Sequence, residues 1–320
     1  MLREYARRRP RQLASRLLGS APVAPVARLV SSGRVPILAY HDVADAAIFA
    51  RHLDLIQEHY RPVRGEQVAT AIRDGARLPR GAIWITFDDA NPGVFTNAMA
   101  LLVQRAVPAT LFVCPGVVDT DRPYWWQILD LALSSGRKVV HGGKAWSEHS
   151  VVTHLKGVSD DARRATVARV ADELAAAGQP AATAQATSAD LHRWLSAGLE
   201  LGNHTWDHPC LDTCDDEQQR RQIVTADDWL RDLLGKRPQL FAYPNGNVAR
   251  TSRTVLAELG YDVAALFDHR LARPHGPEVS RLRIDADAPP RRLAAIASGA
   301  HPAAYALLQR LRAGAAGAKN

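Results

Sequence analysis

The segment from Ala82 to Asn91 constrains the fold more than any other part of the chain. Its first six residues are uncharged and mostly apolar, and two adjacent carboxylates, Asp88 and Asp89, follow them. Such a run predicts a strand that is buried on both faces, as in a parallel sheet. Parallel sheets carry their chemistry just beyond the C-terminal ends of their strands. Because neighbouring carboxylates repel unless a cation or a shared proton is present, the pair marks a candidate functional site. The alternative is an aspartate that caps the next helix.

A second apolar segment, which begins at Leu199, ends in a polar cluster that contains His204 and His208. Their spacing allows one turn of backbone to aim both imidazoles at one point. Two neutral imidazoles and one carboxylate form a ligand set for a divalent transition metal, with positions left open for water and substrate. Cys210 and Cys214 lie beside the histidines, so a cysteine-rich zinc site is the alternative.

These segments resemble the NodB-like polysaccharide deacetylases, which form carbohydrate esterase family four. The family's motifs are Thr-Phe-Asp-Asp-Gly, His-Ser/Thr-x-x-His and Arg-x-Pro-Tyr/Phe. The first two match residues 86–89 and 204–208, and the third is degraded here to Phe-Ala-Tyr-Pro-Asn-Gly at residues 241–246. The resemblance covers roughly residues 35–285. It implies an α/β fold, namely a distorted, incomplete (β/α)7-8 barrel called the NodB homology domain.

The resemblance also implies metal-dependent hydrolysis of the N-acetyl amide of N-acetylhexosamine units in a polysaccharide or glycan precursor, with release of acetate. Asp89, His204 and His208 are the expected metal ligands, and zinc is the favoured cation, with Co2+, Ni2+ or Mn2+ as alternatives. Asp88 is the expected general base, which takes a proton from water. The backbone N–H of Asn245 would hold the developing oxyanion. The residues expected to contact the glycan are Trp125, Trp126, Trp206, Tyr243 and Pro244.

The chain departs from the family pattern at the arginine that orients the base, which aligns with Ala242. Arg281 or Arg283, in the last predicted strand, is expected to replace it. Of these two residues, Arg281 is preferred.

The general acid departs from the pattern as well. The family's late Leu-x-His motif has no convincing match, because His301 is followed by Pro302 in an Ala-rich helical region. Residues 38–43 instead place His41 at the end of the first predicted strand, which resembles the branch of the family that deacetylates poly-N-acetylglucosamine. His41 is therefore expected to protonate the leaving amine, with Asp42 orienting it. The alternative for His41 is a core or capping histidine.

Three regions are predicted along the 320 residues: a basic leader, 1–33, that is poorly ordered or membrane-peripheral; a barrel, 34–290; and a C-terminal helical tail, 291–320. Strand–helix alternation predicts a parallel sheet. The alternation lapses in a helical insertion at about 119–187. There, residues 134–156 are expected to be irregular, and large apolar side chains are too few for a separate core. Trp125 and Trp126 either anchor this insertion to the barrel or stack on sugars. No glycine-rich nucleotide motif follows a predicted strand, so a nucleotide cofactor has no support.

The formal net charge is +7, and six arginines lie within the first 16 residues. No nucleic-acid motif accompanies them, so no nucleic acid is expected as a partner, whereas an anionic lipid or glycan precursor is compatible. The leader is expected to contact a membrane surface or to be a disordered tail. Arg16 interrupts the apolar stretch that a secretion signal needs, and no run approaches 18 apolar residues. Together with the odd, low number of three cysteines, this predicts a cytoplasmic location, including the inner face of the membrane.

Two other functions stay open at this point. An amidohydrolase on the same scaffold would cleave a non-sugar amide or a formyl group. A non-catalytic relative would bind a glycan, which the missing arginine and the displaced histidine would permit. Metal content together with acetate release separates the three functions.

Overall fold

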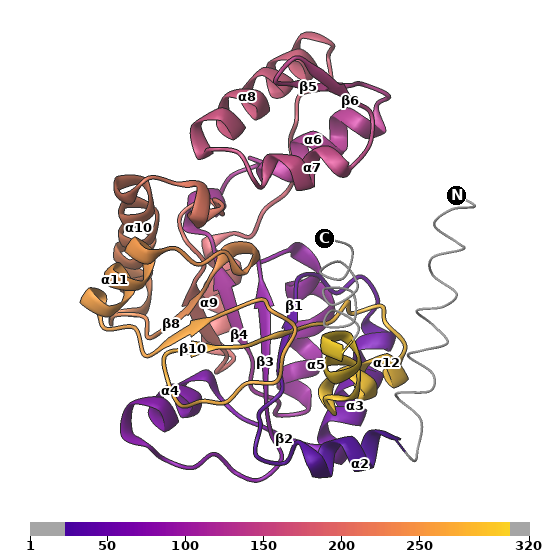
Figure 1. The fold of residues 1–320 in the computed structure, drawn as a ribbon, viewed down its shortest axis with the longest axis vertical. Coiled ribbons are helices and arrows are strands. Elements are labelled where there is room, and N and C mark those ends of the chain that lie inside the picture. The colour runs from indigo at the N-terminus through magenta and orange to yellow at the C-terminus, as the bar shows by residue number, and fades with distance from the viewer. Residues whose placement is uncertain (1–22, 308–320) are drawn as a thin grey trace, which may run out of the picture.

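A curled parallel sheet forms the centre of the structure, a computed structural model that describes residues 23–307 (Figure 1). The strand order is β10-β9-β8-β7-β4-β3-β1-β11, and β2 pairs with the start of β3. The strands are β1 (Ile37–Tyr40), β2 (Arg61–Pro62), β3 (Ala82–Asp88), β4 (Thr110–Val113), β7 (Glu200–Asn203), β8 (Leu240–Ala242), β9 (Val263–Ala265), β10 (Glu278–Val279) and β11 (Leu282–Arg283). β10 and β11 lie at opposite ends of this order, yet only two residues separate them in the chain. The sheet therefore curls until its edges approach, which confirms the predicted incomplete barrel.

β3 is buried along its whole length, as its uncharged sequence predicts. Trp84 packs with residues of five other strands, among them Phe112 and Val263, on the concave side of the curl. Ile85 and Phe87 point to the opposite side and pack against helices. Both faces of the strand are thus in apolar surroundings, so only its end can present polar groups.

Most helices of the barrel cover the outer side of the sheet, where one apolar cluster joins them to the strands. The helix that contains Val68 packs instead in the cluster of Trp84, and the helix that contains Val255 packs in a third cluster with Phe241. The ends of the helices follow local sequence signals: the Asp45 side chain accepts the N–H groups of Ala47 and Ile48 at the start of α3, and Gly235 adopts a left-handed conformation after α10. The helices of the barrel are α3 (Ala46–His59), α4 (Gly65–Asp74), α5 (Met99–Gln104) with a preceding π-helical turn (Val94–Ala98), α9 (Ser188–Ser196), α10 (Asp216–Leu234), α11 (Arg250–Leu259) and α12 (Pro290–Ala297).

Between β4 and β7 the chain leaves the barrel and forms a lobe, which projects at the top of Figure 1. The lobe comprises α6 (Trp125–Ser134), the hairpin of β5 (Val139–His141) and β6 (Lys144–Trp146), α7 (Ser150–Leu155) and α8 (Asp160–Ala176). The domain boundaries expected from the sequence stay a prediction.

Two expectations about this lobe are wrong. Residues 134–156 are not irregular, because they form the hairpin and α7. The lobe also has an apolar cluster of its own, made mainly by Leu, Ile and Val side chains, with Trp125 and Trp146 packed against it. On α8, Val167, Val170 and Leu174 recur at helical spacing, so a few residues form a continuous buried stripe.

The leader expected at residues 1–33 is described only in part, since residues 1–22 lie outside the described range. Its remainder contains α2 (Val23–Val30), after which Ser31 Oγ donates to the carbonyl of Ser298 at 2.9 Å. Between residues 23 and 307, no helix combines the length and the apolar character that crossing a bilayer requires. The three cysteines are buried and free. Membrane contact and the cytoplasmic location stay predictions.

Candidate active site

The two carboxylates lie at the C-terminal end of β3, where the backbone changes direction. Asp88 is the last residue of the strand, and Asp89 and Ala90 both adopt left-handed conformations, with φ of 68° and 52°. Such conformations are unusual for residues other than glycine and persist only where the surroundings hold them. The turn brings both carboxyl groups to one cavity, about 370 Å³ in volume, instead of to opposite faces of the sheet.

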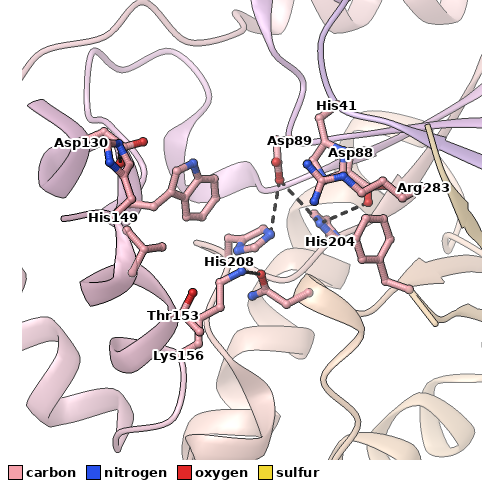
Figure 2. Close-up of a pocket in the computed structure, with 14 residues that line it drawn as sticks. His41, Asp88, Asp89, Asp130, His149, Thr153, Lys156, His204, His208 and Arg283 are labelled. Carbon is pink, nitrogen blue, oxygen red and sulfur yellow. Dashed lines mark hydrogen bonds and ion pairs between the residues drawn. The ribbon is translucent and has the colours of Figure 1, made fainter. Parts of the chain in front are cut away.

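Asp89, His204 and His208 converge in this cavity (Figure 2). Asp89 Oδ1 lies 3.6 Å from His204 Nε2 and 3.5 Å from His208 Nε2, and all three side chains are buried. His204 Nδ1 donates to the carbonyl of Ala242 at 2.8 Å, which leaves the Nε2 lone pair facing the carboxylate. Asp89 Oδ1 has no hydrogen-bond donor although it is buried. An orphaned carboxylate oxygen between two imidazole nitrogens fits a divalent transition metal.

Metal binding at these residues is expected to release a proton. Burial and the charge of Asp88 raise the pKa of Asp89 well above 3.8, so without a metal this carboxyl group binds a proton at pH values at which an exposed aspartate is ionised. Burial lowers the pKa of His204 to about 4 and that of His208 well below 6.5, so both imidazoles are neutral near pH 7 and release none. The cation must displace the Asp89 proton, so affinity should fall by up to about tenfold per pH unit below the raised pKa. Calorimetry in buffers of different ionisation enthalpy measures the release, and an affinity that does not change with pH would contradict this origin.

Arg281 forms a two-pronged ion pair with Asp88, at 2.7 and 2.9 Å. Its Nε donates to the carbonyl of Leu266 and its Nη1 to Thr86 Oγ1, and the side chain is fully buried. Burial raises the pKa of Asp88, but the charge and hydrogen bonds of Arg281 outweigh this effect and hold the pKa below its usual value. Arg283, the other candidate, also lines the cavity, but its side chain is exposed and its Nε lies 3.4 Å from Asp285 Oδ1, without a contact to Asp88 (Figure 2).

His41 lines the same cavity from the end of β1, with its ring against Phe267. The expected contact between His41 and Asp42 is wrong: the Asp42 carboxylate accepts the N–H of Val43 at 2.8 Å, within its own turn. His301 lies outside the cavity, where it hydrogen-bonds His269 at 2.9 Å.

Asn245, on the loop after β8, has a left-handed φ of 56° and also lines the cavity. Lys156, at the end of α7, donates to Asn245 Oδ1 at 2.5 Å. The lobe therefore reaches across the cavity to the loop that carries the expected oxyanion donor. Cys210 Sγ lies 3.6 Å from Asn245 Nδ2, and neither Cys210 nor Cys214 belongs to the metal-ligand group.

The family model for polysaccharide deacetylases matches residues 75–264, a range that includes both carboxylates and both histidines. This chain belongs to the polysaccharide deacetylase family. It shares 23% identity over 265 residues with the poly-beta-1,6-N-acetyl-D-glucosamine N-deacetylases of Escherichia coli K12 and O157:H7. The alignment covers 73% of this chain and 34% of each relative, so the chain spans about one third of their length.

Solved structures of deacetylases share the fold of this family member. The Streptococcus pyogenes deacetylase PplD, in complex with acetate, superposes with a TM-score of 0.58 at 18% identity, over 82% of this chain and 98% of its own. IcaB from Ammonifex degensii superposes with a TM-score of 0.55 at 19% identity, over 83% of this chain and 97% of its own. The deacetylase domain of BpsB from Bordetella bronchiseptica superposes with a TM-score of 0.52 at 16% identity, over 78% of this chain and 96% of its own.

The lobe of this family member supplies one wall of the cavity. Trp126 stacks on Tyr124, with ring centroids 4.5 Å apart, and its edge meets the His208 ring at the same distance. Tyr124 Oη donates to the backbone carbonyl of Asp89 at 2.9 Å. The remaining lobe residues at the wall are Asp130, His149, Val152, Thr153 and Lys156.

Of the five residues expected to contact the glycan, only Trp126 lines the cavity. Trp125 faces a neighbouring cavity beside Arg163, and Trp206 packs against Gly116. Tyr243 and Pro244 are buried, the former against Phe241. Sequence reasoning missed Tyr124, whose signal was its place in an aromatic run, and Lys156, for which the sequence carried none.

Proposed function

We propose that this protein is a metal-dependent hydrolase of the N-acetyl amide of N-acetylhexosamine units in a polysaccharide or glycan precursor, and that it releases acetate. The observation that carries the proposal is the Asp89–His204–His208 set, which shares one cavity with the Arg281-paired Asp88. The curated relatives are named as deacetylases of poly-beta-1,6-N-acetyl-D-glucosamine, which supports an N-acetylated glycan as the substrate.

The chain's own residues divide the reaction between them. A divalent cation held by Asp89, His204 and His208 supplies Lewis acidity for a carbonyl oxygen and for water. Asp88 accepts the proton of the attacking water. Arg281 keeps Asp88 ionised and fixes its orientation through two parallel hydrogen bonds. The backbone N–H of Asn245 donates to the developing oxyanion, and His41 donates a proton to the leaving amine.

Acetate release together with metal content tests the proposal. The purified protein is incubated with β-1,4- and β-1,6-linked N-acetylglucosamine oligomers, before and after treatment with a chelator. Acetate should form only with metal present and should return when zinc is restored. Bound metal without acetate release would favour an amidohydrolase for a non-sugar amide or formyl group. If the protein binds the oligomers but binds no metal and releases no acetate, it is a glycan-binding relative.

His41→Ala is expected to lower kcat/KM by about 10²–10⁴-fold, the usual effect of losing a positioned acid. Burial lowers the pKa of His41 below 6.5, an effect that the charge of Asp88 opposes. Because the protonated form is required, the rate should fall as the pH rises through this lowered pKa, and that limb should be missing in the variant. Hydrolysis of an aryl acetate ester should slow less in His41→Ala, because its leaving group needs less protonation.

His301→Ala is the matched control, because His301 contacts His269 outside the cavity. It should leave the pH profile and the rate unchanged. If His301→Ala abolishes turnover and His41→Ala does not, the acid lies in the C-terminal segment and the assignment of His41 is wrong.

A further inference from the structure

The loop between the two histidine ligands has an unusual backbone. Thr205 and His208 both adopt left-handed conformations, with φ of 70° and 62°. Residues with a β-carbon persist in this region only where other contacts over-determine it. The loop that presents both imidazoles therefore depends on its neighbours for its shape.

Gln222, on α10, supports the loop from the barrel side. Its Oε1 accepts the N–H groups of Trp206 and Asp207, at 3.1 and 3.2 Å. Its Nε2 donates to Asp207 Oδ1 at 2.8 Å. This contact holds the middle of the loop but uses only part of the acceptor capacity of the Asp207 carboxylate.

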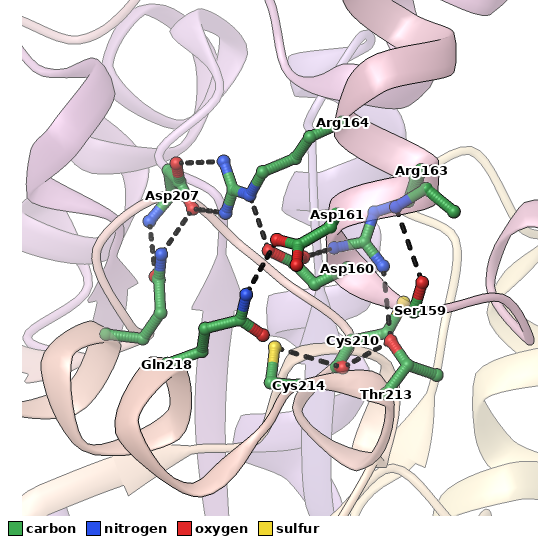
Figure 3. Close-up of polar contacts among 12 residues, drawn as sticks. Ser159, Asp160, Asp161, Arg163, Arg164, Asp207, Cys210, Thr213, Cys214 and Gln218 are labelled. Carbon is green, nitrogen blue, oxygen red and sulfur yellow. Dashed lines mark hydrogen bonds and ion pairs between the residues drawn. The ribbon is translucent and has the colours of Figure 1, made fainter.

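Arg164, on α8 of the lobe, supports the loop from the opposite side (Figure 3). Its two terminal nitrogens donate to the two oxygens of Asp207, both at 2.8 Å. This parallel fork is the strongest geometry that an arginine and a carboxylate can form. The Asp207 side chain is 14% exposed and that of Arg164 is 44% exposed, so the carboxylate is largely removed from water while the arginine stays partly in contact with solvent.

Arg164 is itself held in place by the first turn of α8. Its Nε donates to Asp160 Oδ2 at 2.5 Å, and the buried Asp160 also pairs with Arg163. Nearby, Gln218 of α10 donates to Asp161 at 2.7 Å. The apolar cluster of the lobe contains no residue of the barrel. Trp126 of the lobe packs with Cys114 and Val117 of the barrel, but α8 itself meets the histidine loop through this polar network.

From these contacts we propose that Arg164 is a positioning residue for the metal site: through Asp207 it holds the His204–His208 loop in the shape that binds the cation. The inference rests on the proposed metal-dependent function and deepens it, because it makes the lobe part of the metal site. A role in attaching the lobe alone would change stability but not the metal affinity of the folded protein.

The test is the zinc affinity of Arg164→Met and Asp207→Asn, measured by competition with a chromophoric chelator. Each variant should weaken binding by about 10–100-fold, the usual cost of losing a partner that orients a ligand. Since the two residues act through one contact, the double variant should bind zinc as tightly as the single variant with the lower zinc affinity. The d–d spectrum of the cobalt-loaded protein should change in the same variants, because it reports the geometry of the ligands.

Arg220→Met is the matched control, since it removes an arginine that pairs with Glu258 on the surface of α10 and α11. It should leave affinity and spectrum unchanged. If both single variants bind zinc within about threefold of the parent and keep its cobalt spectrum, the proposal is wrong, even if their melting temperatures fall.

Should Arg164→Met fail to fold, Asp207→Asn and Arg164→Lys carry the same test, because the first keeps the shape of the contact and loses its charge, and the second keeps the charge and loses the planar two-pronged geometry. A parent protein that binds no zinc would overturn the proposed metal site and this inference together. Normal zinc binding in the parent with unchanged affinity in the variants would overturn the inference alone.

Discussion

His204→Ala is expected to empty the metal site and to abolish metal-dependent turnover. Four-ligand structural zinc sites bind with about 10–16 kcal/mol, or roughly 3–4 kcal/mol per ligand, so losing one imidazole should weaken binding by about 10²–10³-fold. The variant also loses the Nδ1 hydrogen bond to Ala242, which fixes the orientation of the ring. Metal content by elemental analysis and acetate release are measured on the same preparation.

His52→Ala separates loss of a ligand from loss of a buried histidine. The His52 ring is also buried, where it accepts from Tyr40 Oη and donates to the carbonyl of Ala288, outside the cavity. This control should lower the melting temperature and keep the metal. Full metal occupancy in His204→Ala would remove the basis for the ligand assignment.

Asp88→Asn is expected to keep the metal and to lower turnover by about 10²–10⁴-fold, because an amide cannot accept the proton of water. The substitution also leaves the buried Arg281 without a charged partner, and breaking a buried pair in this way costs about 3–5 kcal/mol. Stability should therefore fall as well. In the parent the folded pKa of Asp88 lies below 3.8, so the pair stabilises the protein above that pH and is lost as the pH falls below it.

Asp227→Asn is the control for this prediction. Asp227 is buried on α10 and accepts a hydrogen bond from Tyr261 Oη, and neither residue lines the cavity. It should reduce stability without a comparable loss of rate per folded molecule. Near-parental hydrolysis by Asp88→Asn, in protein that is folded and metal-loaded, would show that a different group acts as the base.

The barrel and the convergence of Asp89, His204 and His208 were predictable because contiguous stretches of sequence encode them. The uncharged run of β3 and the close spacing of His204 and His208 each specify one strand end, and parallel strands bring their ends to one edge. The arginine that replaces the family's base-orienting arginine could be narrowed to two candidates, because both lie in the last predicted strand. Only the structure shows that Arg281 lies inside the curl and Arg283 at the surface.

The lobe was predicted less well, for a physical reason. Its core takes only a few apolar residues from each of several elements, so no single segment carries a strong periodic signal. Its contacts with the site are also distant in sequence: Arg164 and Asp207 are 43 residues apart, and Lys156 and Asn245 are 89 apart. Such contacts depend on how the lobe sits over the barrel, which local patterns do not encode.

The short link between β10 and β11 has a consequence for the order of folding. Arg281 lies in this link and pairs with Asp88, 193 residues earlier in the chain. Arg281 reaches its place only when β10 pairs with β9 and β11 pairs with β1, so its contact with Asp88 needs both edges of the sheet. The metal ligands, in contrast, follow strands β3 and β7, which are separated only by β4 in the sheet and come earlier in the chain. We therefore expect a folding chain to acquire its metal-binding residues first and an oriented base only when the two edges of the sheet meet.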